Sequence, residues 1–380
     1  MTVKARSAVE RLAWHYEHPL AQAMEKARNG TPIAGITSNT VPWELMRAAG
    51  YFPVMLNPSR GPVPVAEQFM EDGVFGARIR GIFDGIVSGA WPFLTMVVIP
   101  RTSEQEHKLF LYLREAARQG IATALPDLYL YNLLHSRSTE AEQYGFERTQ
   151  GLIKHLEHHA GRSIEQADLA RAVEESNLAF HAIRKLLGLR QCPQPRLSGT
   201  EGLPLIGAVH FMDRAEYARL AQEAVSECSD RAPKRGVRIM IKGSPLNHTG
   251  LHRAIESHRA VVVAEDDWWG SRSITKEIAA QGDMVRSIFE TYYFDAPSPR
   301  VFPREVADEW FIATSANIDG VVFYLPPEDD VLGWDYPWLR KTLDQRGIPS
   351  LLVREDASDE LSSECHQRID DFISGIAAGS

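Results

Sequence analysis

A chain of 380 residues, 44% of them hydrophobic, is long enough to bury two sizeable cores, and its length predicts two or three domains. Its formal net charge of −9 excludes a basic surface for phosphate backbones, so nucleic acid is not an expected partner. Cys192, Cys228 and Cys365 lie far apart and form neither a disulfide framework nor a zinc knuckle. No apolar run is long enough for a membrane span or a leader, which predicts a cytoplasmic protein.

The first 30 residues predict one amphipathic packing helix that ends at Gly30. Residues 33–36 then predict a strand, residues 37–40 a polar loop, and Pro42 the start of a helix.

The same order of strand, Ser/Asn/Thr loop, helix and strand recurs later, around a second loop at 243–249. We interpret the chain as two similar α/β domains, one in each half. The matched strands are 33–36 with 237–241, 52–56 with 261–264, 96–100 with 319–323, and 121–126 with 348–355.

Between the halves, residues 163–188 predict a long helix, with Ser163 and Gln166 as a capping box and Gly188 as its end. A Pro-rich linker follows it. The predicted organisation is an N-terminal helix at 1–30, a first α/β domain at 31–160, a helix and linker at 161–200, and a second α/β domain at 201–380.

Several stretches resemble one family in the same order along the chain. They are VPWELMRAAGYFPV, KGSPLNHTGLHRAIE, VVVAEDDWWGSR, DGVVFYLP, RGIPSLLVRED and QRIDDFI. This pattern resembles the 2-hydroxyacyl-CoA dehydratase and benzoyl-CoA reductase family over residues 33–372. The resemblance implies two Rossmann-like parallel-sheet domains that face each other across a cleft. It also implies an acyl-CoA ester in that cleft, a four-iron, four-sulfur cluster beside it, a related partner subunit, as a homodimer or heterodimer, and an ATP-dependent activator.

The cluster-ligating cysteines of the family are absent from this sequence. The resemblance places them at Ala77, at Ser103, and between Leu325 and Asp330, where the chain reads Leu-Pro-Pro-Glu-Asp-Asp. Iron–sulfur clusters need thiolate ligands. We therefore expect no cluster in this chain, and structural roles for its three cysteines.

Polar residues after the first strand are the first candidates for substrate binding. Hydroxyl and amide groups of Ser38, Asn39 and Thr40 could hold a thioester carbonyl as an oxyanion hole, with Ser38 in a catalytic role. The alternative is a motif that caps the helix at Pro42. Arg78 could meet the phosphates of CoA, with a surface arginine as the alternative.

The equivalent loop of the second half offers Ser244 and Asn247 as substrate ligands and His248 as an acid or base. A solvated histidine in a polar loop is the alternative for His248. Ser103 and Glu104, which follow the third strand, are further candidates for substrate binding and for acid–base catalysis.

Asp266, Asp267, Gly270 and Arg272 match the D-D-x-x-G-x-R pattern of the resemblance. We expect an ion pair that orders this loop, a tight turn at Gly270, and contacts of Asp267 and Arg272 with substrate. Trp268 and Trp269 would wall an acyl pocket or simply pack in the core.

Two groups of side chains in the sequence are of types that can ligate a metal, and neither predicts a metal site. Glu328, Asp329 and Asp330 form an acidic loop, which is typical of a solvated surface. His155, His158 and His159 have helical spacing, but the sequence identifies no carboxylate to join them.

Three functions remain open on the sequence. The first is a dehydratase-family subunit that binds an acyl-CoA ester in its cleft and acts with a cluster-bearing paralogue. The second is a non-redox small-molecule-binding or scaffold protein. The third is a lyase that works by acid–base chemistry, for which only His248, Glu104 or Asp267 offers a base.

Overall fold

The computed structural model describes residues 7–58, 61–71, 73–122, 124–273, 276–356 and 361–379, without the side chain of Asp330. Its strands form two four-stranded sheets, ordered β2-β1-β3-β4 and β6-β5-β7-β8, in which every neighbouring pair is parallel. The two orders are the same when each sheet is counted from its own first strand. The prediction of two similar Rossmann-like α/β domains is therefore confirmed.

The first sheet places short apolar strands between helices. Its strands are β1 (Ile33–Ile36), β2 (Phe52–Met55), β3 (Leu94–Pro100) and β4 (Asp127–Tyr131). The helices that connect or follow them are α3 (Trp43–Ala48), η2 (Ala66–Gln68), α4 (Ala77–Val87), α5 (Glu104–Arg118) and α6 (Thr139–Ala160). All residues of β1 and β2 are buried, as parallel strands covered on both faces require.

The second sheet buries a separate apolar cluster on each face. Ile239 and Ile241 of β5 join one cluster, and Met240 between them joins the other, because alternate residues of a strand point to opposite faces. The strands are β5 (Val237–Gly243), β6 (Ala260–Asp266), β7 (Gly320–Tyr324) and β8 (Ser350–Val353). The helices around them are α10 (Gly250–Glu256), α12 (Arg304–Thr314), η4 (Ser315–Asn317), α13 (Asp330–Gln345) and α14 (Ser363–Gly379).

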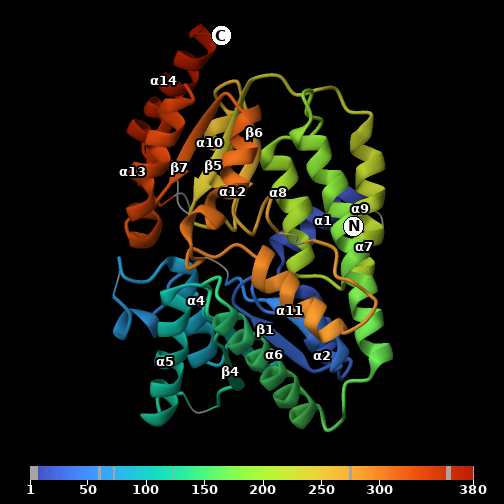
Figure 1. Cartoon of the computed structure of the whole chain (residues 1–380). Coiled ribbons are helices and arrows are strands. Elements are labelled where there is room, and N and C mark those ends of the chain that lie inside the picture. The colour runs from blue at the N-terminus through green and yellow to red at the C-terminus, as the bar shows by residue number, and fades with distance from the viewer. Residues whose placement is uncertain are drawn as a thin grey trace.

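A helical layer runs along one side of both sheets (Figure 1). It consists of α1 (Ala8–Glu17), α7 (Gln166–Gln191), α8 (Gly199–Gly207), η3 (Ala208–His210) and α9 (Arg214–Ser229). Helix α7 packs on α9, on α3 of the first domain and on β6 of the second, so it holds the two domains together. The predicted limits of the domains stay a prediction.

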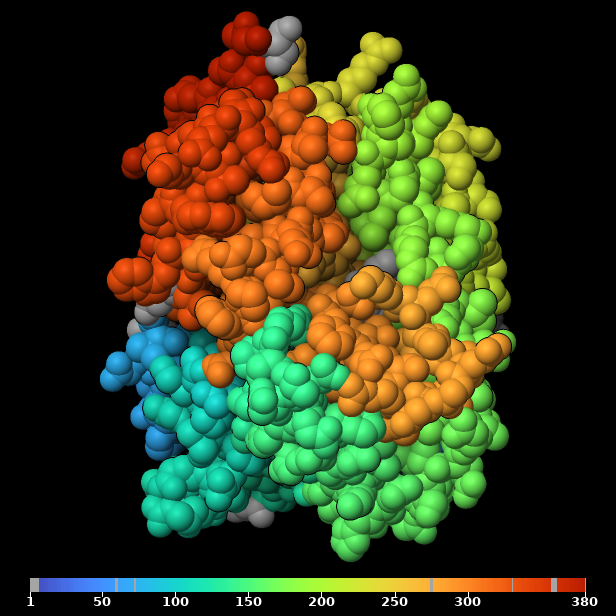
Figure 2. Space-filling model, viewed as in Figure 1, coloured from blue at the N-terminus to red at the C-terminus, as the bar shows by residue number. Residues whose placement is uncertain are grey.

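One segment of the second half packs on the first domain. Helix α11 (Met284–Asp295) lies against α6, and Figure 2 shows its orange surface in contact with the green surface of α6. The ring of Phe289 in α11 packs at a tilt against Phe146 of α6, with centroids 5.6 Å apart. The chain therefore crosses the gap between the sheets again on its way from β6 to β7.

The prediction of a single N-terminal helix is wrong, because the segment forms two helices, α1 and α2 (Ala21–Arg28), with Pro19 between them. Proline has no N–H for the helical hydrogen bond and clashes with the preceding turn. Helix α1 begins instead with a capping box between Ser7 and Glu10. Residues 1–6 of the predicted helix lie outside the described part of the chain.

Three other predicted boundaries are also wrong. Helix α7 begins at Gln166 without a side-chain cap, and it continues through Gly188 because the next turn buries Arg190 completely. Strand β4 follows the predicted strand at 121–126 instead of coinciding with it, because Pro126 has no N–H for the sheet, whereas the Leu and Tyr residues of β4 pair in register with β3.

Within the described residues, no helix combines the length and the apolar character that a membrane crossing requires.

Candidate functional site

A cavity of about 520 Å³ lies between the carboxyl edges of the two sheets. In each sheet the strand order reverses between the first and third strand, which is where open α/β sheets bind ligands. The loops after β1 and β3 line the cavity from one domain, and those after β5 and β7 line it from the other. The fold thus brings two switch points together at one site.

Most of the predicted site residues line this cavity. They are Ser38, Arg78, Ser103, Glu104, Ser244, Asn247, His248, Asp267 and Arg272. Asn39 and Thr40 lie beside it, and Thr40 is buried. The roles that we predicted for these residues stay predictions.

The loop after β1 is held by hydroxyl groups of the first domain. Ser38 Oγ donates to Thr102 Oγ1 at 2.7 Å, and Thr40 Oγ1 lies 2.6 Å from the same atom. The alternative in which these hydroxyls cap α3 is wrong, because Pro42 occupies the N-cap without any side-chain bond. Asn39 reaches across to the second half and donates from Nδ2 to the Pro297 carbonyl at 3.2 Å.

Glu106 is a buried carboxyl group of the cavity that our sequence analysis missed. It accepts from Thr37 Oγ1 at 3.1 Å and from the Ser103 backbone N–H at 3.0 Å. Burial raises its pKa above the usual range. The signal was present in the sequence, since Ser103 and Glu106 have the S-x-x-E spacing of a capping box at the start of α5.

Arg78 packs inside the cavity, so the surface position that we considered for it is wrong. Its guanidinium lies 5.4 Å from the ring centroids of both Trp268 and Trp269. The same group donates from Nη2 to the backbone carbonyls of Thr37 at 2.6 Å and Leu56 at 2.8 Å. Burial lowers its pKa to about 10. Arg78 therefore ties the first domain to the tryptophan pair of the second.

The loop after β5 also bridges the domains. Asn247 Nδ2 donates to Asn57 Oδ1 of the first domain at 2.6 Å. Ser244 donates from its hydroxyl to the Asp329 carboxylate of the loop after β7. His248 accepts from the Gly250 N–H through Nδ1 at 3.2 Å, which places the proton of the neutral ring on Nε2. The loop is thus bonded to its neighbours and is not merely solvated.

The ion pair that we predicted after β6 is confirmed, and it has an additional partner. Arg272 Nη1 lies 2.9 Å from Asp266 Oδ1, and Lys242 Nζ donates to the other carboxylate oxygen. Lys242 was not among the predicted site residues, although a charged residue near the end of the apolar strand β5 indicates a position at the ligand-binding edge of the sheet. Asp266 therefore lies between two cations on the cavity wall.

Asp267 is buried in a loop of backbone donors. Its carboxylate accepts from the N–H groups of Trp269 at 2.8 Å, Gly270 at 2.9 Å and Leu246 at 3.3 Å. Burial and the nearby charge of Glu265 raise its pKa to about 7. The group therefore changes charge near neutral pH.

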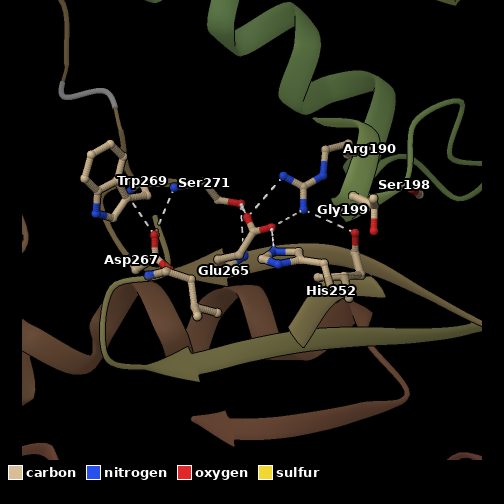
Figure 3. A network of polar contacts seen from close by, with 12 residues as sticks. Arg190, Ser198, Gly199, His252, Glu265, Asp267, Trp269 and Ser271 are labelled. Atoms are coloured by element: carbon tan, nitrogen blue, oxygen red, sulfur yellow. Dashed lines mark hydrogen bonds and ion pairs between the residues drawn. The ribbon is translucent and has the colours of Figure 1, made fainter. Parts of the chain in front are cut away.

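A fully buried ionic network lies beside this loop (Figure 3). Glu265 accepts from Arg190 at 2.5 and 3.1 Å and from Ser271 Oγ at 3.0 Å, and its Oε1 lies 2.8 Å from His252 Nε2. Glycine is needed at position 270 because a Cβ there would lie 2.4 Å from Glu265 Oε2, which is a different reason from the tight turn that we predicted. The network fixes the floor of the site to α7.

Glu104 is the candidate base at the exposed rim. Arg101 Nη2 lies 3.2 Å from its Oε1, and Arg300 pairs with the same carboxylate. The two guanidinium groups favour the ionised carboxylate, but they also occupy its oxygen.

The three places where the resemblance puts cysteines meet in this cavity. Ala77, Ser103 and Glu328 all line it, and a Cβ on the neighbouring Gly76 would lie 3.2 Å from Glu328 Oε1. Asp329, beside Glu328, also caps α13 by accepting from the Leu332 N–H at 3.1 Å. The side chain of Asp330 lies outside the described residues.

The cysteines of the chain lie elsewhere. Cys192 follows α7, Cys228 ends α9, and Cys365 is buried in α14, and none of the three lines the cavity.

A family model described as the 2-hydroxyglutaryl-CoA dehydratase D-component matches residues 39–376. The chain belongs to this family. Two curated relatives agree with the match. The (R)-phenyllactyl-CoA dehydratase beta subunit of Clostridium sporogenes is 20% identical over 54% of this chain and 56% of its own length, so the chain spans little more than half of that relative. The beta subunit of the (R)-2-hydroxyglutaryl-CoA dehydratase of Acidaminococcus fermentans is 18% identical over 86% of this chain and 88% of its own length.

The family match includes the loops after β3, β5 and β7 that line the cavity, and it begins within the loop after β1, so Ser38 lies just outside the matched residues. At 18–20% identity, the comparisons do not carry individual site residues over to this dehydratase-family chain.

Proposed function

We propose that this chain is a dehydratase subunit that binds an acyl-CoA ester in its interdomain cavity, has no cluster of its own, and works beside a cluster-bearing related subunit. One observation carries the proposal. Ala77, Ser103 and the segment from Leu325 to Asp330 stand where the family resemblance puts cysteines, and Ala77, Ser103 and Glu328 of that segment line the cavity between the two switch points. The curated relatives support a partner, because both are named as subunits of a dehydratase.

The donor set of the cavity does not suit an iron–sulfur cluster, whose irons are held by thiolates. Cys228 and Cys365 are buried in helices, and burial raises the pKa of both thiols, which disfavours the thiolate. Cys192 Sγ lies 3.1 Å from the Gln194 carbonyl, to which it donates. Any electron delivered to the substrate would therefore have to come from a redox group outside this chain, such as a cluster of the partner subunit.

The charge of the cavity indicates which end of a CoA ester enters it. Three of its cations pair with carboxylates, as Lys242 and Arg272 do with Asp266 and Arg304 does with Asp308 and Asp335, and Arg78 donates to backbone carbonyls. Such a site gives little attraction to phosphates. The acyl group and the uncharged pantetheine arm suit the cavity, whereas the phosphates of CoA would remain at its rim. A volume of about 520 Å³ lies within the usual range for small-molecule sites.

Two groups of the cavity would position the acyl end. Ser38 lies at the carboxyl end of β1 and donates its hydroxyl proton to Thr102, and it would turn that proton to a thioester carbonyl when the ester binds. Trp268 and Trp269 offer a flat apolar wall on the other side, with ring centroids 4.5 Å apart.

Binding of an acyl-CoA ester is expected to stabilise the folded chain. A ligand at about a hundred times its dissociation constant adds about 2.7 kcal/mol, so thermal unfolding measured with a set of 2-hydroxyacyl-CoA and enoyl-CoA esters should shift upward. Ala77→Trp, which fills the cavity, should abolish the shift. Ala117→Trp is the matched control, because Ala117 is exposed on α5 outside the cavity.

Absence of a shift with every ester would reject acyl-CoA binding. A shift with free carboxylic acids but not with their CoA esters would favour a non-redox small-molecule-binding protein. The cavity offers one reason to keep that alternative, because carboxylates or backbone carbonyls already engage four of its cations, which suits a ligand that carries less negative charge than CoA.

Iron and sulfide should be near background in the chain purified without oxygen. Colorimetric iron and acid-labile sulfide assays give the result directly, and a cluster-bearing dehydratase subunit purified in parallel shows that clusters survive the procedure. About four irons per chain would show that this chain carries a cluster and would overturn that part of the proposal.

A further inference from the structure

Two imidazoles and a carboxylate meet near the amino end of β4 in the first sheet, whereas the cavity lies at the carboxyl ends of the strands. Asp127 begins the edge strand β4, and His155 and His159 lie one turn apart on the face of α6 that packs on it. His155 Nε2 is 2.5 Å from Asp127 Oδ2, and His159 Nε2 is 3.8 Å from Asp127 Oδ1. The structure thus supplies the carboxylate that the sequence alone did not identify.

The spacing of these atoms suits a small divalent ion. One ligand atom from each residue lies within 4.8 Å of the other two. A tetrahedral zinc ion with bonds of about 2.0–2.1 Å holds its ligand atoms roughly 3.3 Å apart. Zinc binding would widen the 2.5 Å contact and close the 3.8 Å contact.

The surroundings hold the ligands while leaving one side open. Tyr129 packs on the His155 ring at 4.6 Å, and the His159 ring lies 4.5 Å from that of His155. The Asp127 side chain is 28% exposed, so its carboxylate is partly buried beside the two imidazoles. His159 is 37% exposed, which leaves room for a water as fourth ligand.

A hydrogen bond between His155 and Asp127 would by itself hold α6 to β4 without any metal. It does not explain why a second imidazole points its Nε2 at the other oxygen of the same carboxylate. Two imidazoles and one carboxylate are a donor set that zinc and its late first-row neighbours favour.

We propose that Asp127, His155 and His159 bind one zinc-like divalent transition ion. The site lies outside the family's cavity, and it would tie the long helix α6 to the exposed edge of the first sheet. It is independent of acyl-CoA binding.

Titration of the chelator-treated full chain with Co²⁺ tests the site, because the visible absorption of Co²⁺ reports low-coordinate geometry, and calorimetry with Zn²⁺ gives the stoichiometry. We expect one ion per chain. His159→Ala keeps the His155–Asp127 hydrogen bond and should weaken binding at least about tenfold, as the loss of a metal-site partner does. Asp127→Asn should weaken it similarly, and binding should weaken as the pH falls because zinc takes neutral imidazole.

His158→Ala is the matched control. His158 is the adjacent residue on α6, is exposed, and belongs to no ligand group among the described residues. Equal weakening by His158→Ala and His159→Ala would mean that surface histidines bind the ion without a built site, and it would overturn the proposal. The same holds if the unaltered chain shows no Co²⁺ spectrum and no Zn²⁺ heat. Neither result affects the acyl-CoA test, since no residue of this site lines the cavity.

Discussion

Replacement of Arg190 by methionine is expected to lower the free energy of unfolding by about 3–5 kcal/mol, the typical effect of removing one partner of a buried ion pair. Arg190 and Glu265 are both fully buried, and Arg190 also donates to the Val262 carbonyl at 3.2 Å. Methionine fills much of the same volume but leaves the Glu265 carboxylate with only His252 and Ser271 as partners. Chemical denaturation followed by tryptophan fluorescence measures the change.

Arg184→Met is the control for this change. Arg184 lies on the same helix, two turns before Arg190, and its ion pair with Glu277 is exposed at 37% and 62%. Exposed pairs contribute about 0–1 kcal/mol, so this variant should remain close to the unaltered chain. If both variants lose the same small amount, the buried network does not hold α7 to β6.

Much of the fold follows from local sequence patterns. The apolar runs of β1, β3, β5 and β6 are bounded by Gly, Pro and polar residues. Such runs are typical of parallel strands that helices cover on both faces. The repeat of strand, polar loop and helix in each half then predicts the two sheets. The mistakes concern boundaries, where tertiary contacts override local signals. Gly188 does not end α7 because the following turn contributes the buried Arg190.

The site was predictable only in part. Ser38, Ser244 and Asp267 follow strands, so the rule that ligands bind at the carboxyl edge of a parallel sheet finds them. Contacts between distant segments leave no local signal. The bond of Asn247 to Asn57 joins residues 190 positions apart, and Arg78 meets Trp268 across the domain boundary. Asp127 joins the histidines of α6 in the same way, over 28 residues.

The contribution of Asp267 to the free energy of unfolding should fall as the pH rises from about 4 to about 7. Three backbone N–H groups favour the ionised carboxylate, but burial and the charge of Glu265 outweigh them and raise its pKa to about 7. Between the unfolded pKa of about 4 and this value, the folded state holds one proton more than the unfolded state. Stability then decreases by about 1.4 kcal/mol per pH unit, or about 4 kcal/mol in all. Unfolding of the chain and of Asp267→Asn, measured by denaturant at several pH values, gives this contribution as the difference between them.

Asp267→Asn keeps acceptors for the N–H groups of Trp269 and Gly270 but cannot ionise. It should therefore be the less stable protein near pH 4 and the more stable one above pH 7. Asp266→Asn is the matched contrast. Burial opposes ionisation of Asp266, yet the charges of Lys242 and Arg272 outweigh it and lower the pKa of that carboxyl group. Asp266 thus contributes stability that is present above the unfolded pKa of about 4 and is lost on further acidification. The difference between the unaltered chain and Asp266→Asn should therefore stay constant from about pH 4 to pH 7, where the difference for Asp267→Asn changes by about 4 kcal/mol. If the differences for the two variants changed equally between about pH 4 and pH 7, Asp266 and Asp267 would not be one charged and one neutral carboxyl group in that range.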